Sequence, residues 1–156
     1  MKYIALILAL FLSACSTKTY ERTQTKIITI KSPKIKFSDV GYLRNSEKSL
    51  ELELFVAGKC IERIAINHLV CVSDGCKSKS TFNEEYLSSV YPEDIMQNIL
   101  LSHAIYGGKN LQKTADGFEQ KIQDSKVDIS YKVSAHAVLF KDRINGIIFS
   151  IKDLDE

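Results

Sequence analysis

Short motifs that mark many enzyme active sites are missing from this 156-residue sequence. It contains no Gly-x-Ser-x-Gly elbow, no His-Glu-x-x-His and no glycine-rich phosphate loop, because Gly107-Gly108 is not followed by Lys-Ser or Lys-Thr. The three histidines, His68, His103 and His136, are far apart along the chain. We therefore predict a protein that is not an enzyme and that has no cofactor and no metal site.

An excess of charge of one sign is also missing. The chain has 21 basic and 19 acidic residues, and loss of Lys2 with the N-terminal leader described below leaves 20 against 19. This balance argues against nucleic acid as a partner and provides no strong attraction to an anionic surface. A local basic run alternates with apolar residues and is typical of a solvated strand face, with contact to lipid headgroups as the alternative; its lysines are Lys26, Lys31, Lys34 and Lys36.

The apolar run at the N-terminus is too short to be a permanent membrane span. Tyr3 to Ala14 would measure about 18 Å as a helix, against a hydrocarbon core of roughly 30 Å. A basic start at Met1-Lys2 and small residues at Ser13-Ala14 complete the layout of a secretory signal peptide. We predict that residues 1–14 are a signal peptide.

The residues at the predicted cleavage site, Leu12-Ser13-Ala14-Cys15, resemble the lipobox of bacterial lipoproteins. The resemblance implies that Cys15 receives a diacylglycerol, that cleavage occurs before it, and that an acyl chain such as palmitate is added to the new amine. Two or more acyl chains hold a protein stably on a bilayer, at about 0.8 kcal/mol per buried CH₂ group. Ser16 resembles the outer-membrane class, so we expect an outer-membrane lipoprotein on the periplasmic face. The alternative is a secreted protein in which Cys15 is incidental.

Polar residues separate this anchor from the rest of the chain. Residues 15–25 are rich in Ser, Thr, Lys, Glu and Gln and lack apolar periodicity, so we predict the acylated cysteine followed by a flexible tether. The remaining residues, 26–156, are enough for one domain with a sizeable core and not comfortably for two. We predict a single periplasmic β-rich domain.

Alternation of apolar and polar residues predicts antiparallel strands on both sides of a central helical segment. The alternating segments are Ile28–Ile30, Ile35–Phe37, Leu50–Val56, Ile64–Val72, Phe118–Ile122, Val127–Leu139 and Ile147–Ile151. Asn145-Gly146 supplies a hairpin turn before the last segment. The predicted fold class is mainly β (α+β), an antiparallel sheet forming an incomplete barrel or sandwich with a central helical insertion.

Helix signals occupy the centre of the chain. Thr81-x-x-Glu84 fits a capping box, and Pro92 fits a first helical position in a run that Gly107-Gly108 ends, so we predict one or two helices here. Four apolar residues recur at helical spacing, and we expect them to face the concave side of the sheet as candidate ligand-facing residues: Ile95, Met96, Ile99 and Leu100.

Other polar residues fit structural roles better than a site. His68 falls in the apolar phase of a predicted strand and His103 closes the helical apolar face, so both are predicted to be hydrogen-bonded core side chains. Glu51 and Glu53 stand two apart on one strand face, which we interpret as alternating charge on the outer face of the strand rather than as a carboxylate pair.

Three cysteines follow Cys15, and the oxidising periplasm favours disulfides. The turn Ser73-Asp74-Gly75 places Cys71 and Cys76 opposite each other on paired strands, which predicts a disulfide between them. If Cys60 to Val72 is one extended segment, Cys60 lies about 36 Å from Cys71, far beyond the roughly 7 Å limit for bridging. Cys60 is therefore predicted to be a free thiol.

The order of strands, central helices and strands resembles that of the LolA/LolB family of periplasmic lipoprotein carriers and outer-membrane receptors. The resemblance covers most of the mature chain, includes the helical stretch Tyr91–Asn110, and departs from the family in the absence of tryptophan and in the cysteine-flanked turn. It implies an incomplete antiparallel barrel whose hollow apolar face, covered by helices, accepts acyl chains.

Two functions follow as hypotheses. The first is a membrane-anchored envelope lipoprotein that acts as a binding module for lipid, lipoprotein acyl chains or an envelope-protein partner. The alternative is a structural or surface-displayed interaction or adhesion lipoprotein with an immunoglobulin-like β-sandwich. An apolar cavity favours the first, and a sheet filled by its own side chains favours the second.

Overall fold

Eleven strands and two short α-helices make up the part of the chain that the computed structural model describes, residues 20–46 and 49–154. The first strands are β1 (Arg22–Lys31), β2 (Lys36–Asn45), β3 (Leu50–Val56), β4 (Lys59–Ile66), β5 (Val70–Val72) and β6 (Gly75–Lys77). Helices α2 (Lys79–Tyr86) and α3 (Ile95–Leu100) and the 3₁₀ turn η1 (Tyr106–Gly108) follow. The last strands are β7 (Leu111–Lys113), β8 (Phe118–Gln123), β9 (Asp128–Val133), β10 (Ala137–Asp142) and β11 (Ile147–Asp153). The predicted fold class, mainly β with a central helical insertion, is confirmed.

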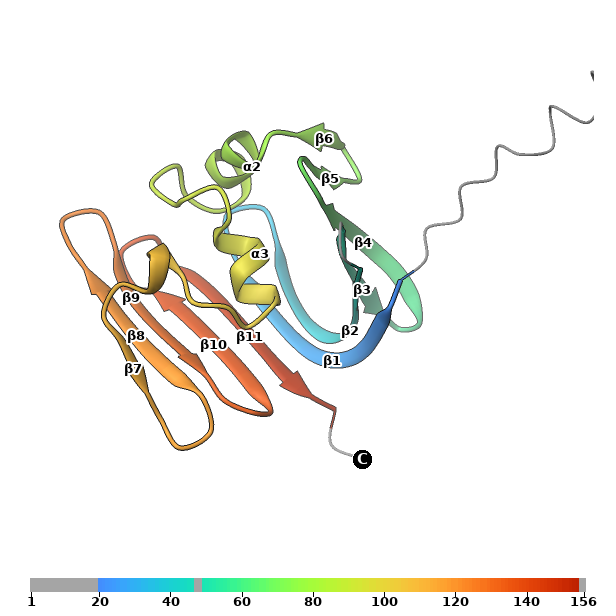
Figure 1. The fold of residues 1–156 in the computed structure, drawn as a ribbon. Helices are drawn as coiled ribbons and strands as arrows, with labels where there is room; N and C mark the ends of the chain where they lie inside the picture. The colour runs from blue at the N-terminus through green and yellow to red at the C-terminus, as the bar shows by residue number, and fades with distance from the viewer. Residues whose placement is uncertain (1–19, 47–48, 155–156) are drawn as a thin grey trace, which may run out of the picture.

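All eleven strands belong to one antiparallel sheet, in the order β6-β5-β4-β3-β2-β1-β11-β10-β9-β8-β7. β1 pairs with β11 and so joins the two halves of the chain, with Ile28 opposite Ile151 and Ile30 opposite Phe149. The sheet bends around the helices, which lie on its concave side (Figure 1). One continuous ladder therefore encloses the core, as in an incomplete barrel.

The concave face carries the apolar side of the alternating pattern. Ile30, Phe149, Phe140 and Tyr131 are cross-strand partners in turn and are at most 1% exposed. The Phe140 ring lies 6.1 Å from Phe149 and 6.2 Å from Tyr131, in edge contacts. Such β-branched and aromatic pairs fit the pleated surface and stabilise the sheet.

Two segments predicted as single strands are hairpins. Ile64–Val72 divides into β4 and β5, which pair through Ile66 and Val70. Because both of these residues are buried, the three-residue turn between them preserves the apolar phase and hides the break. The prediction that His68 is a core residue is wrong, because this side chain is exposed in the turn.

The segment Val127–Leu139 also folds back, as β9 and β10. Here Val133 pairs with Val138, so the buried phase changes from odd to even residues across the turn. Leu139 is consequently on the convex face and 43% exposed. The predicted turn at Asn145-Gly146 is confirmed, because it connects the paired strands β10 and β11.

Helix α2 begins earlier than its sequence signal suggests, and helix α3 begins later. The N-cap of α2 is Ser78, whose hydroxyl oxygen accepts from the Thr81 backbone N–H at 3.1 Å, so the predicted capping box starts three residues too late. α3 begins three residues after Pro92 and ends at Leu100. His103 lies beyond that end and is exposed, so the prediction that it closes the apolar helix face is wrong.

The first strand of the structure overlaps the end of the predicted tether. β1 begins at Arg22, which pairs with Asn45, so the last residues of the predicted tether belong to the sheet. The predicted signal peptide and Cys15 lie outside the described residues. No helix among those that the structure describes is long and apolar enough to span a membrane.

Candidate functional site

The four candidate ligand-facing residues are buried between α3 and the concave face of the sheet. Ile95 and Ile99 are 0% exposed, Met96 is 2% exposed and Leu100 is 3% exposed. All four belong to the same hydrophobic core as the sheet residues. A side chain without accessible surface borders no space that could hold a water molecule, so α3 fills the concave side. We call Ile95–Leu100 the plug.

The chain before the plug is fastened by hydrogen bonds. The Tyr91 hydroxyl donates to Asp142 Oδ2 at 2.7 Å, and Asn83 Nδ2 donates to the Pro92 carbonyl at 2.9 Å. Burial acts to raise the pKa of Asp142, but hydrogen bonds from Asn145 and Tyr91 outweigh it and hold that pKa below its usual value. Burial and the bond to Asp142 raise the pKa of Tyr91, so the contact is intact at neutral pH.

The chain after the plug is fastened by Gln120, a fully buried side chain on β8. Gln120 Oε1 accepts from the Ile105 N–H at 2.9 Å, and Nε2 donates to the carbonyls of Ile105 at 3.0 Å and Lys109 at 2.8 Å. The Tyr131 hydroxyl also donates to the His103 carbonyl at 2.9 Å. The plug is thus held at both ends by side chains of the sheet.

Sequence reasoning does not single out these fastening residues, although a signal exists. Gln120 occupies the apolar phase of β8 between Phe118 and Ile122, and Asp142 continues the apolar phase of β10 beyond Phe140. A polar side chain in the buried phase of a strand must find hydrogen-bond partners. That argument identifies both residues but not the segment that they hold.

The connection from the plug to β7 has a strained backbone. Ser102, Tyr106 and Asn110 have φ angles of 59°, 49° and 55°, in the left-handed region that costs non-glycine residues about 1–2 kcal/mol each. The Tyr106 hydroxyl is buried without a hydrogen-bond partner among the described residues, and burial raises its pKa to about 12. Packing and the Gln120 bonds therefore hold this connection in an unfavourable conformation.

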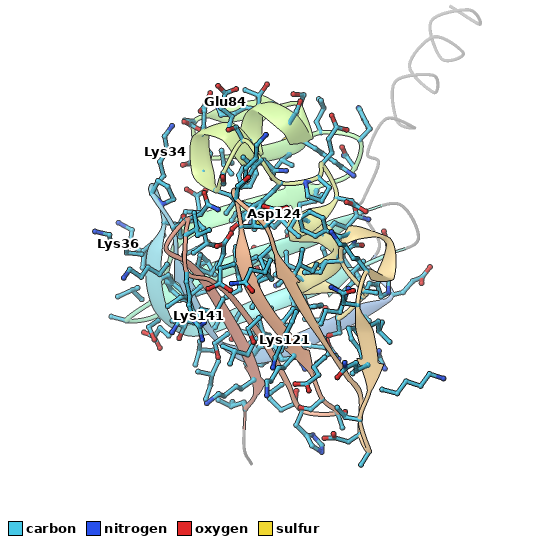
Figure 2. All side chains as sticks on the ribbon, turned by 90° about the vertical axis from the view of Figure 1, so that its left-hand side faces the viewer. Lys34, Lys36, Glu84, Lys121, Asp124 and Lys141 are labelled. Atoms are coloured by element: carbon cyan, nitrogen blue, oxygen red, sulfur yellow. A yellow bond between two sulfur atoms is a disulfide. The ribbon has the colours of Figure 1, made fainter. Side chains whose placement is uncertain are left out.

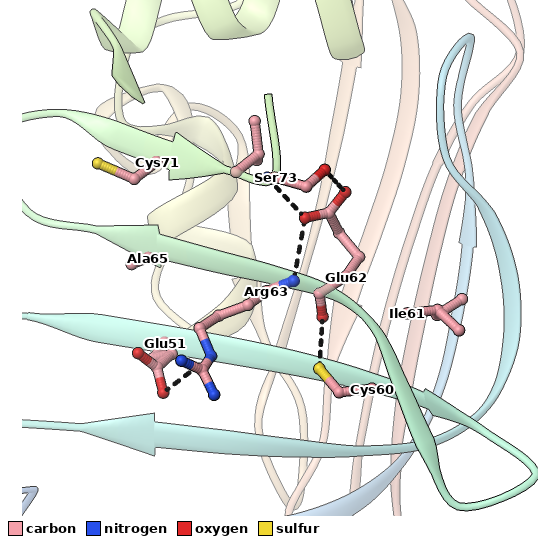
Figure 3. A pocket seen from close by; sticks show the side chains of 9 residues that line it. Glu51, Cys60, Ile61, Glu62, Arg63, Ala65, Cys71 and Ser73 are labelled. Atoms are coloured by element: carbon pink, nitrogen blue, oxygen red, sulfur yellow. Dashed lines mark hydrogen bonds and ion pairs between the residues drawn. The ribbon is translucent and has the colours of Figure 1, made fainter. Parts of the chain in front are cut away.

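A second group of interacting side chains lies on the convex face; it includes Glu53 and Glu51, of which Figure 3 shows Glu51 beside Arg63. Both residues lie on the outer face of the sheet as predicted, but Glu51 and Glu53 are only 6% and 3% exposed because other side chains cover them there. Arg44 Nη1 lies 2.7 Å from Glu53 Oε2, and Arg63 Nη2 lies 2.6 Å from Glu53 Oε1. The strand register brings these charges together, because Arg44 on β2 is opposite Glu51 and Arg63 on β4 is opposite Glu53.

Tyr20 attaches the start of the described chain to this network. Its hydroxyl donates to Glu51 Oε2 at 2.7 Å, and burial together with the nearby carboxylate raises the pKa of Tyr20 to about 12. The hydrogen bond and charge of Glu53 raise the pKa of Arg63. The charges of the two glutamates are thus balanced by two arginines, which is how buried charges are tolerated.

A shallow groove of about 480 Å³ adjoins the network, between β4 and the hairpin of β5 and β6 (Figure 3). The β4–β5 ladder stops at Ala65 and Cys71. Beyond it, the Glu62 carboxylate accepts from the Arg63 N–H at 3.0 Å, the Ser73 N–H at 3.0 Å and the Ser73 hydroxyl at 2.9 Å. These backbone donors are therefore occupied, which protects the edge of β4 against pairing with another strand.

Cys71 and Cys76 form the predicted disulfide and are cross-strand partners. Cys60 is a half-buried free thiol. The reason given for it from the sequence is wrong, because the chain from Cys60 to Val72 is a hairpin and not one extended segment. Cys60 stays apart because it lies near the start of β4, whereas Ala65 near the other end of that strand is the residue opposite Cys71.

The three histidines are not brought together. His136 is exposed and its Nδ1 lies 3.0 Å from Asp153 Oδ2, while the other two lie in separate turns. Within residues 20–46 and 49–154, no group of three or more His, Cys, Asp or Glu side chains is arranged to hold a metal ion. Comparisons of the chain with family models, curated proteins and solved structures found no match.

Proposed function

We propose that this protein is a membrane-anchored cell-envelope lipoprotein whose domain binds acyl chains of lipids or lipoproteins. The observation that carries the proposal is the kind of structure that covers the apolar concave face of the sheet. Two short helices and their connecting segments cover this apolar surface, with α3 as the plug, and no second sheet does so among the described strands. A helix of six residues is too short to be stable alone, so the plug depends on its contacts with the sheet. An apolar ligand that makes the same contacts can replace it.

The energies of the plug and of an acyl chain are similar. Burying the four apolar side chains of the plug is worth about 1.5–3 kcal/mol each, or roughly 6–12 kcal/mol together. A sixteen-carbon chain at about 0.8 kcal/mol per CH₂ gains roughly 12 kcal/mol on full burial. Release of the strained residues Ser102, Tyr106 and Asn110 further favours displacement. Exchange between plug and acyl chain is therefore close to balanced, as reversible binding requires.

Truncation of the plug tests this competition. Ile99→Ala should lower the free energy of unfolding by about 2–5 kcal/mol, because the side chain is fully buried. If plug and ligand compete, the same change should raise the affinity for a fluorescent palmitate analogue at least about tenfold, the factor that 1.4 kcal/mol produces. A weakened plug that improves binding is the opposite of what an ordinary lost contact does.

Leu52→Ala is the matched control. Leu52 is also fully buried, but it belongs to the sheet and faces whichever occupant is present. Its truncation should destabilise the protein without improving the affinity for the probe. Equal affinities of Ile99→Ala and the unaltered protein would contradict the competition between plug and acyl chain.

One observation favours the second candidate, a displayed interaction domain. The plug leaves no accessible space around Ile95 and Ile99, so the interior is filled in the structure described. If neither the unaltered protein nor Ile99→Ala binds the palmitate analogue, and native mass spectra contain no co-purified lipid, the acyl-binding proposal fails. A membrane-anchored structural or interaction domain is then the function to pursue.

A further inference from the structure

A row of lysines crosses the convex face of the sheet. Cross-strand register aligns residues of neighbouring strands from β2 to β8 in the order Lys36, Lys31, Ile148, Lys141, Ser130 and Lys121. The four lysines are exposed, and Figure 2 shows Lys36, Lys141 and Lys121 on one side of the molecule. We call Lys31, Lys36, Lys121 and Lys141 the lysine row.

The lysine row carries positive charge that the described residues do not neutralise. Strands lie about 4.8 Å apart, so five intervals from β2 to β8 give the row a length of about 24 Å. No salt bridge of the described residues includes any of its lysines. Acidic groups at neighbouring positions of this face are already paired, Glu119 with Lys132 at 3.2 Å and Asp128 with Arg143 at 3.3 Å.

We propose that the lysine row is a docking surface for the anionic lipid headgroups of a bilayer. Charge complementarity supports this partner, because a bilayer offers anionic groups at any spacing and does not need a preformed pocket. Each basic residue close to an anionic membrane contributes its own attraction, and the lysine ammonium is a point charge on a flexible side chain. Ile27 and Leu139, which lie on the same face and are 39% and 43% exposed, add apolar surface beside the row.

This contact would orient a domain that an acyl anchor alone leaves free to rotate. Arg22 follows Cys15 by seven residues, which span at most about 24 Å when fully extended, so the anchor keeps the domain close to the bilayer. Weak attraction suffices at the high local concentration that a short connection creates. With the lysine row on the headgroups, the plug on the concave side points away from them. The proposal rests on the proposed anchor for its location and not for the contact itself.

Vesicle binding tests the lysine row independently of acylation. The full chain with Cys15→Ala is mixed with vesicles rich in phosphatidylglycerol or made of phosphatidylcholine alone. We expect tighter binding to the anionic vesicles and loss of the difference as the salt concentration rises. Lys36→Gln combined with Lys141→Gln should weaken binding to the anionic vesicles roughly 25-fold, at about fivefold for each lysine.

The control is Lys59→Gln combined with Lys113→Gln, which removes the same charge from exposed positions outside the row. This pair should leave vesicle binding within about twofold. Equal losses in both double variants would show that total charge matters and would overturn the proposal, as would equal binding to both kinds of vesicle. Binding to polyglutamate without binding to vesicles would replace the bilayer with an acidic protein partner. None of these outcomes depends on whether Cys15 is acylated in the cell.

Discussion

Replacing Gln120 with methionine should loosen the attachment of the plug, and the cost can be worked out from three hydrogen bonds. The substitution keeps the length of the side chain and removes its polar atoms. Ile105 is fully buried, so its N–H loses its Gln120 partner in a place without water, whereas its carbonyl still accepts from the Gly108 N–H at 2.9 Å. The Lys109 carbonyl belongs to an exposed residue and can turn to water. At about 1–3 kcal/mol for a buried group left unpaired, the loss from the Ile105 N–H is about 1–3 kcal/mol.

Urea denaturation and thermal unfolding measure this loss. For a domain of this size the melting midpoint should fall by roughly 4–12 °C, and amide exchange between residues 101 and 110 should accelerate. Gln112→Met on β7 is the control, because that side chain is exposed and its replacement should change stability by no more than about 0.5 kcal/mol.

Gln120→Glu separates hydrogen bonding from volume through its pH dependence. An ionised carboxylate would face the carbonyls of Ile105 and Lys109, where only a donor is accommodated, whereas the protonated acid can still donate to one of them. The folded state therefore raises the pKa of this glutamate above its ordinary value of about 4.3. Stability is then retained below pH 4.3 and lost as the pH rises through the raised value. A cost below about 1 kcal/mol for Gln120→Met, with no pH-dependent loss in Gln120→Glu, would refute the fastening role.

Two further predictions concern the N-terminal part of the chain. Cys15→Ala should prevent acylation and release the protein to the soluble periplasmic fraction when membranes are washed at high salt, which screens the lysine row; sedimentation of this variant with salt-washed membranes would contradict the acyl anchor. Glu51→Gln should lower the pKa of Tyr20 from about 12 toward its usual value near 10, which NMR of labelled tyrosine can follow with Tyr20→Phe as the assignment control. Because folding raises this pKa, the Tyr20 contact stabilises the fold fully below pH 10 and is lost as the pH rises through about 12; an unchanged pKa in Glu51→Gln would contradict the contact.

Sequence periodicity predicts the strands well because it depends on residues only two positions apart. Leu50–Val56, Phe118–Gln123 and Ile147–Asp153 all lie where alternation indicates. The same pattern cannot detect a tight turn that preserves phase, as between Ile66 and Val70. It also cannot anticipate a turn that changes phase, as between Val133 and Val138, because phase across a turn depends on the number of turn residues.

The candidate site is only partly predictable for a related reason. Helical spacing indicates that Ile95 and Ile99 are buried, since a common apolar face must be covered. It does not indicate that Gln120 and Tyr91 hold the ends of the plug. Each of these residues contacts a segment that is distant in the sequence, and local patterns do not reveal such contacts. Glu51 likewise looks like a solvent-facing charge until its cross-strand neighbour is known to be Arg44.

The sequence by itself determined the features that depend on near neighbours: the strand pattern, the apolar face of α3 and the hairpin that brings Cys71 and Cys76 together. The tertiary structure alone decided the features that depend on strand order. β1 pairs with β11, and only this pairing places Lys31 beside Ile148 and completes a row that continues to Lys141. The physical reason is that hydrogen bonds between distant strands set which side chains share a face, and this register is a property of the whole core.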